Sequence, residues 1–240
     1  MGRLFGWKAC VGVAVAAAGW VAWKAHSART AALTVAALAG APALVEADEV
    51  RTFAVSVDGK AGGTYTVTTA ATADGTETIT VAAEVKVKLA LYTYVYQLNS
   101  AEVWKNGQLV SLDAKSNDDG KRRTVSAVAG DRGLTVTVNR ETRKTGGDVI
   151  TATGVRAPAA DKARDAVMFD AEDGSETAVR VEPLGACKVT VNGQVIEGTR
   201  FKLTGKDVNS EWWFDKTGRV IRQEMKWDGR KVVMELTAVR

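Results

Sequence analysis

The sequence predicts an all-β protein built as an antiparallel curved sheet or barrel. After residue 50, apolar and polar residues alternate with a period of two, as at Phe53, Val55 and Val57, which is the period of a strand and excludes a helix. Pairs such as Asp58-Gly59 and Asn106-Gly107 separate these segments, and they supply the positive φ angles that two-residue hairpins require. The regular spacing predicts about twelve to fourteen strands.

The longest alternation in the first half runs from Val85 to Tyr96. Its odd positions are mostly apolar, whereas its even positions change from Lys86 and Lys88 to three tyrosines. We interpret it as one strand with a wet end and a covered or cavity-lining end. Further strands are expected before it around Phe53, Tyr65 and Ile79, and after it around 101–104, 109–112, 125–128 and 134–138.

A break in the pattern follows between Thr142 and Gly174. This segment is rich in glycine, and its residues 157–164 carry the only hint of a helix in the body of the chain. We therefore expect either one short helix or a loop insertion over one end of the sheet. The hairpin pattern then resumes in the segments 178–181, 188–191, 195–203, 211–215, 219–227 and 231–238.

The charges of the body are nearly balanced. The whole chain carries +4, but residues 1–47 hold four basic residues and one acidic residue, which leaves 28 basic and 27 acidic residues from Asp48 onward. A balanced body lacks the basic patch that phosphates require, so no nucleic-acid partner is expected. The only histidine, His26, precedes the body, and Cys187 is its single cysteine. We expect no cofactor, no metal site and no intramolecular disulfide in it.

Residues 1–47 are predicted to be a leader with a signal peptide, and residues 48–240 a single β domain. The apolar run 30–45 follows the basic residues Lys24 and Arg29, and its length of about fifteen residues suits a signal peptide. Cleavage is expected after Ala47, with 41–43 as the competing site, and the protein is expected to be periplasmic or secreted.

An earlier apolar run, Ala9–Trp23, leaves two interpretations open. Either translation starts further downstream, near Val21, or this run is a short membrane anchor. For the mature chain, residues 48–240, we expect no stable membrane span.

Two stretches carry family motifs. Glu102, Trp104, Gly107 and Leu109 form a Glu-x-Trp-x-x-Gly-x-Leu hairpin, and further matches occur at Asn117, Asp118, Gly120, Phe201, Leu203, Gly205, Trp213, Phe214 and Asp215. With these motifs, most of residues 50–240 resembles domain of unknown function family 6134, exported β-rich bacterial proteins; the segment 164–169 departs from its pattern. The resemblance implies a periplasmic β protein with no established activity, and a fold-level analogy to lipoprotein-carrier half-barrels.

The candidate site is an aromatic and acidic face of the sheet. Alternation places Glu102 on the face of Trp104, and Glu211 on the face of Trp213. If those faces are interior, indoles and carboxylates would surround an apolar ligand; otherwise the tryptophans belong to the core and the acids to the solvent side. We predict that the following residues bind a ligand: Leu91, Tyr92, Tyr94, Glu102, Trp104, Phe201, Glu211 and Trp213.

The leading hypothesis is a non-catalytic envelope protein that binds an apolar or lipid-like molecule. The first alternative is an envelope protein-protein interaction module with a packed interior and an unknown protein partner. A carboxylate-dependent hydrolase using Glu102 and Glu211 is the second alternative, but no residue is assigned a catalytic role. The run Asn117–Gly120 is expected to be a turn and not a calcium loop, because position 128 is valine.

Overall fold

The computed structural model describes residues 49–89 and 91–240. In these residues the chain forms fifteen strands and no helix. The first eight are β1 (Glu49–Val57), β2 (Lys60–Ala71), β3 (Thr76–Leu89), β4 (Tyr92–Lys105), β5 (Gln108–Asp118), β6 (Lys121–Gly130), β7 (Gly133–Val138) and β8 (Glu141–Thr145). The others are β9 (Val149–Thr151), β10 (Arg164–Phe169), β11 (Glu176–Val191), β12 (Gln194–Gly205), β13 (Val208–Asp215), β14 (Val220–Trp227) and β15 (Arg230–Val239).

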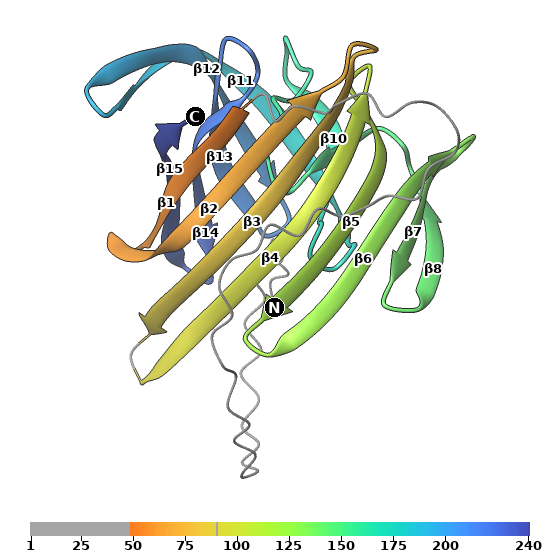
Figure 1. Ribbon diagram of the computed structural model, residues 1–240, viewed down its shortest axis with the longest axis horizontal. Helices are drawn as coiled ribbons and strands as arrows, with labels where there is room; N and C mark the ends of the chain where they lie inside the picture. Colours follow the sequence, from red (N-terminus) through yellow and green to blue (C-terminus); the bar gives the residue numbers. More distant parts are fainter. Residues whose placement is uncertain (1–48, 90) are drawn as a thin grey trace. The chain divides into compact units, whose positions relative to one another are not determined.

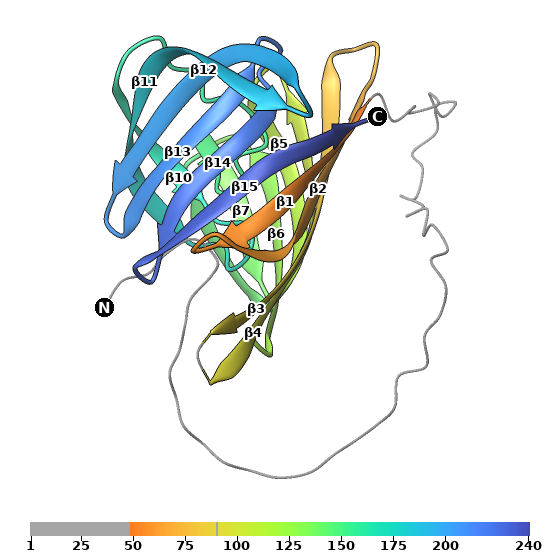
Figure 2. The same ribbon diagram turned by 90° about the vertical axis from the view of Figure 1, so that its left-hand side faces the viewer.

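All of these strands belong to one curved sheet that does not close. Its order is β8-β7-β6-β5-β4-β3-β2-β1-β15-β14-β13-β12-β11-β10-β9, so its edges are β8 and β9. Neighbours are antiparallel except for β9 and β10, which run parallel. Strands β1 to β6 lie in front of β11 to β14 (Figure 1), and the side view shows these two walls facing each other (Figure 2). The predicted all-β fold of antiparallel curved strands is confirmed.

Short turns of Asn or Asp with Gly connect many of the strands, as the sequence predicts. Asp58 and Gly59 have φ angles of 50° and 76°, and Asn106 and Gly107 have φ angles of 51° and 77°. Asn and Asp tolerate this left-handed region better than other residues with a Cβ atom. The turn residues therefore set the register of the hairpins locally.

The prediction of one strand from Val85 to Tyr96 is wrong. Strand β3 ends at Leu89 and β4 begins at Tyr92, so two paired strands replace the single one. The change of direction switches the buried positions from odd numbers in β3 to even numbers in β4. Hence Lys86 and Lys88 face solvent on β3, while Tyr94 and Tyr96 are buried on β4.

For the segment between Thr142 and Gly174 the sequence left a short helix or a loop insertion open, and the structure has the loop insertion. Residues 157–163 are bends and irregular chain without a helix, and the short strands β9 and β10 lie on either side of them in sequence. Residues 149–151, 153–155 and 168–172 are buried. We call 149–155 and 169–172 the inner segments, because their side chains join the buried core of the curved sheet.

Apolar side chains from both walls meet the inner segments. Phe53, Leu112, Leu203 and Ile221 are each fully buried, and Trp212 packs edge-on against Phe214 with ring centroids 6.3 Å apart. None of the described residues forms a helix long and apolar enough to cross a membrane. Residues 1–48 lie outside the described part of the chain, so the leader, its cleavage site and the domain boundary stay predictions.

Replacing Gly198 with alanine is expected to destabilise the sheet. A Cβ atom on Gly198 would lie 1.8 Å from the carbonyl oxygen of Phe214 on the paired strand β13. Overpacking of this kind lowers the free energy of unfolding by about 1–3 kcal/mol. Urea unfolding curves check it, with Gly146→Ala as control, since no atom lies within 4 Å of a Cβ there. Equal midpoints for the two variants would contradict the prediction.

Candidate functional site

Polar contacts hold the first inner segment between the two walls. The carbonyl oxygen of Thr153 accepts hydrogen bonds from Tyr65 Oη on β2 and from Gln223 Nε2 on β14, each 3.1 Å long. Gln223 Nε2 also donates to the carbonyl oxygen of Gly154, at 3.1 Å. These bonds satisfy backbone groups that have no ladder partner, so the segment is fixed to strands from both halves of the sheet.

Glu102 is the main side-chain contact of this segment. It is fully buried, and it accepts hydrogen bonds from Trp104 Nε1 (2.9 Å), Thr151 Oγ1 (3.0 Å) and Thr153 Oγ1 (2.6 Å). Burial raises the pKa of Glu102, although all three bonds favour its charged form. Every carboxylate oxygen has a partner within the protein, so Glu102 holds the segment in place and offers no free group to a ligand.

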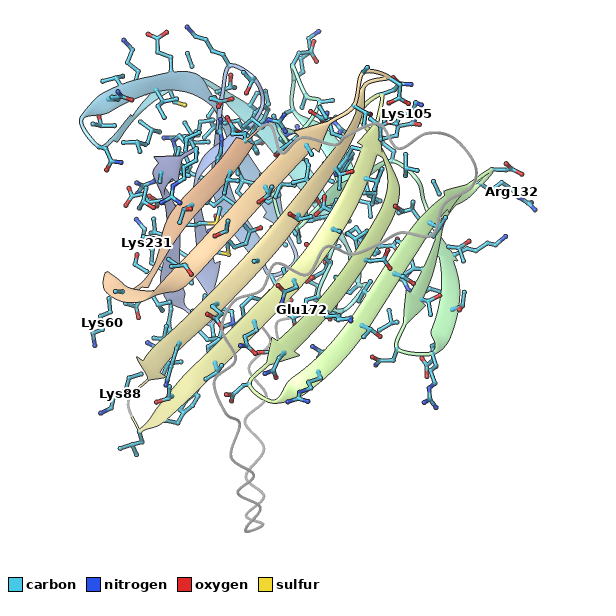
Figure 3. All side chains as sticks on the ribbon, in the orientation of Figure 1. Lys60, Lys88, Lys105, Arg132, Glu172 and Lys231 are labelled. Atoms are coloured by element: carbon cyan, nitrogen blue, oxygen red, sulfur yellow. The ribbon has the colours of Figure 1, made fainter. Side chains whose placement is uncertain are left out.

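The second inner segment is held by strands β5 and β6. Ser116 Oγ donates to the carbonyl oxygen of Glu172 at 3.1 Å, and Arg123 Nη1 donates to Glu172 Oε1 at 2.9 Å. Glu172 itself is almost completely buried, and it lies within the outline of the sheet, unlike Lys60, Lys88 and Arg132 at the hairpin ends (Figure 3). The result is a carboxylate placed inside a largely apolar core.

Glu172 is one of several acids grouped on this side of the interior. Burial, followed by the charges of Asp170 and Asp118, raises the pKa of Glu172 to about 9 in spite of Arg123. Burial also raises the pKa of Asp118, whose Oδ1 accepts a hydrogen bond of 2.7 Å from Tyr94 Oη. Since several negative charges cannot coexist cheaply in a buried space, the raised pKa of Glu172 favours its protonated form.

A cavity of about 70 Å³ lies between the inner segments and the walls. Its wall is mainly apolar, with Glu172, Asp170, Thr153, Gln223 and two tyrosines as the polar exceptions. It is lined by Val55, Tyr65, Val85, Tyr96, Leu98, Ala152, Thr153, Asp170, Ala171, Glu172, Gln223, Met225, Val232 and Met234. The rings of Tyr94 on β4 and Trp227 on β14 have centroids 4.8 Å apart and so connect the two walls. Both residues are close in sequence to residues that line the cavity. The arrangement provides an apolar space with acids on one part of its wall.

The predicted ligand-binding residues do not form one surface, and none of them lines this cavity. Tyr94, Glu102, Trp104 and Phe201 are buried inside the sheet. Leu91 and Tyr92 do not lie there; they are exposed where β3 turns into β4, because the chain reverses between Leu89 and Tyr92.

Glu211 and Trp213 alternate along β13 with Trp212 and Phe214, which are almost fully buried; Glu211 is half-buried, and Trp213 is 9% exposed. The indole of Trp213 has the guanidinium groups of Arg200 and Arg222 each 5.5 Å from its ring centre. Glu211 Oε2 is 3.4 Å from Arg200 Nε. Neither residue lines the cavity, so their role in ligand binding stays a prediction.

The residues that were missed come mostly from the inner segments and from β14 and β15. Tyr96 and Leu98 could have been found, because they share the even-numbered face of β4 with Tyr94 and Glu102. In contrast, the run from Asp170 to Ser175 has the composition of an exposed turn. Nothing local in its sequence indicates that Glu172 is buried.

The carboxylate pair of the hydrolase alternative and the possible calcium loop can both be located in the described residues. Glu102 is fully buried and bonded within the protein, whereas Glu211 is half-buried beside Arg200, so the carboxylate pair of the hydrolase alternative is not formed. No group of three or more acids, histidines or cysteines in residues 49–89 and 91–240 could hold a metal ion. Asn117 Oδ1 accepts a hydrogen bond from Gly120 N, as in a turn.

The fold defines a β-barrel-like protein with an open sheet and a largely self-filled interior. It is similar to the crystal structure of a β-barrel-like protein of domain of unknown function DUF1849 from Brucella abortus, with a TM-score of 0.61 and 12% identity over 80% of this chain and 96% of that chain. At this identity the likeness concerns the fold alone. The chain belongs to the domain of unknown function family DUF6134, which matches residues 53–237. No curated protein matches it.

The raised pKa of Glu172 predicts a fall in stability with rising pH. A carboxyl group with a folded pKa of about 9 and an unfolded pKa near 4.3 binds more protons in the folded state between these values. Its stabilising contribution is complete below about pH 4 and is lost as the pH rises through 9, with a slope of at most about 1.4 kcal/mol per pH unit.

Urea unfolding of the parent protein and of Glu172→Gln between pH 5 and pH 9 checks this, because glutamine does not titrate. The parent protein should lose stability more steeply than the variant. Glu141→Gln, at an exposed position of β8, should keep the parental slope. Identical slopes for the parent and Glu172→Gln would contradict the assignment.

Proposed function

We propose that this protein is a non-catalytic binding protein of the cell envelope, which receives an apolar group of its ligand inside the curved sheet. The cavity of about 70 Å³ with its mainly apolar wall is the observation that carries this proposal. Apolar cavities that lack polar groups over most of their wall bind apolar guests in preference to water. The methionines Met225 and Met234 add adaptable contacts on this wall.

The size of the cavity limits what enters it. Pockets for drug-sized ligands have volumes of about 300–1,000 Å³, so this cavity accommodates a short alkyl group or the end of a longer chain. The inner segments do not leave more room, because Glu102, Tyr65 and Gln223 hold the first and Arg123 holds the second. A lipid-like ligand would therefore insert one chain end and leave the rest outside.

A second candidate function is an envelope interaction module that uses only its outer surface. The observation in its favour is that the inner segments occupy much of the concave face. Under this alternative the cavity would be a packing defect without a guest. The binding experiment below separates the two candidates, because only the first requires uptake of an apolar molecule.

Export is the second part of the proposal and is supported by the leader sequence. The apolar run 30–45 after Lys24 and Arg29, with the small residues that follow, has the anatomy of a signal peptide. Expression of the full chain in a bacterial host should give a periplasmic product. Amino-terminal sequencing is expected to start at Asp48, whereas a mature protein that retains Trp7 would contradict export with cleavage.

Binding inside the sheet can be followed at the methionine methyl groups. Straight-chain alcohols from ethanol to octanol, added to protein with ¹³C-labelled methionine methyls, should shift the signals of Met225 and Met234. Met168 is buried on β10 and does not line the cavity, so its signal should stay in place. Affinity should rise with chain length and level off once the cavity is full, because each buried methylene contributes about 0.8 kcal/mol.

A cavity-filling variant provides the control for this titration. Val85→Phe adds a ring at the cavity wall and should abolish the shifts, whereas Val128→Phe, on an exposed position, should leave them unchanged. If no alcohol shifts Met225 or Met234 in the parent protein, the binding function is excluded and the interaction module remains. If the alcohols do shift these signals, lipid mass spectrometry of an organic extract would identify the natural ligand.

A further inference from the structure

We propose that the ligand of the cavity is an organic cation, a protonated amine on a short alkyl chain, with its ammonium group at Glu172 and its chain among the apolar side chains. This inference rests on the proposed binding function and specifies its ligand class. The argument combines unpartnered acceptors, the distribution of charge and the shape of the cavity.

Two buried carboxylate oxygens make no hydrogen bond within the protein. Glu172 Oε2 and Asp118 Oδ2 are both without a partner in the described part of the chain, although the two residues are only 2% and 1% exposed. Glu172 lines the cavity. Buried acceptors without donors are destabilising by about 1–3 kcal/mol each, and more where the group is charged. A ligand with N–H groups would supply the missing donor.

The charges near Glu172 favour a cation. Asp170, Asp118 and Asp173 act on it as negative neighbours, and Arg123 is the positive one. Arg123 Nη1 is bound to Glu172 Oε1, so Oε2 is the oxygen that remains for a ligand. An anionic head group would be repelled by these acids, and a neutral head group could donate to Oε2 without compensating the negative charge. An ammonium group has three donors and a compensating charge.

The rest of the cavity wall suits an alkylammonium ion better than a bare metal ion. No three acids, histidines or cysteines of the described residues come together as ligands, and the remaining wall is formed largely by residues such as Val55, Leu98 and Met234. Calcium and magnesium ions need about six or more oxygen ligands. An alkylammonium ion needs only one or two acceptors and an apolar space, which is what the cavity offers.

Binding of a cation also predicts release of a proton. The groups that face Glu172 are Asp170 and Asp173 on its own turn, Asp118 on β5, Arg123 on β6 and, through Asp118, Tyr94 on β4. A bound ammonium group would lower the pKa of Glu172, so binding would ionise this carboxyl. Affinity for the amine should then increase from pH 7 to pH 9 by up to about tenfold per pH unit, while an alkylammonium ion stays protonated.

The test compares butylammonium with 1-butanol, which has the same chain without the charge. In the full-length protein, titrations followed at the Met225 and Met234 methyl signals should give an affinity about tenfold higher for the amine at pH 8, the gain expected of one charge-assisted hydrogen bond. Only the amine should show the increase with pH. Glu172→Gln should bind both probes equally and without pH dependence, whereas Glu141→Gln should behave like the parent.

The outcomes separate this inference from the binding function. Equal affinity for both probes at every pH, or a preference for the amine that survives in Glu172→Gln, overturns the ammonium assignment and leaves the binding function standing. Failure of both probes to shift Met225 and Met234 overturns both proposals. The pH series on the parent protein needs no substitution, so it decides the matter even if Glu172→Gln does not fold.

Discussion

A curved sheet that does not close must cover its own concave face, and this constraint governs the interior of the protein. The fifteen strands direct their apolar side chains inward, and exposing such a face to water would be unfavourable. The chain covers it with the inner segments 149–155 and 169–172. Glu102 fixes the first of these with directional hydrogen bonds, so the position of the remaining cavity follows from where the segments are held.

Much of the fold can be predicted from the sequence because its signals are local. Alternation identifies the faces of single strands, and the Asn-Gly and Asp-Gly pairs identify the turns between them. The exception between β3 and β4 has a physical reason: the run from Leu89 to Tyr92 contains no Gly, Pro, Asn or Asp. Without turn residues, two paired strands have the pattern of one.

The site could be predicted only in part, because it depends on contacts between distant parts of the chain. The shared face of Glu102 and Trp104 follows from alternation, and a hydrogen bond joins these two side chains. Alternation gives two faces but does not say which is concave, so it singled out Trp213, which is 9% exposed, and not its neighbour Trp212, which is fully buried. The acidic turn around Glu172 is held in the interior by Ser116 and Arg123, which are about 50 residues away in sequence. Its own sequence therefore does not indicate its burial.

The pairing of β1 with β15 decides when this sheet can be completed. β1 to β8 and β9 to β15 are each built from neighbours in sequence, but the two halves join through pairs such as Arg51 with Val239 and Val57 with Val232. This seam has a very large sequence separation and therefore a high contact order, which slows folding. During synthesis β1 can pair only with β2 until β15, the final strand, has been made. The edge that it presents in the meantime is a place where a chaperone or a second unfinished chain can pair.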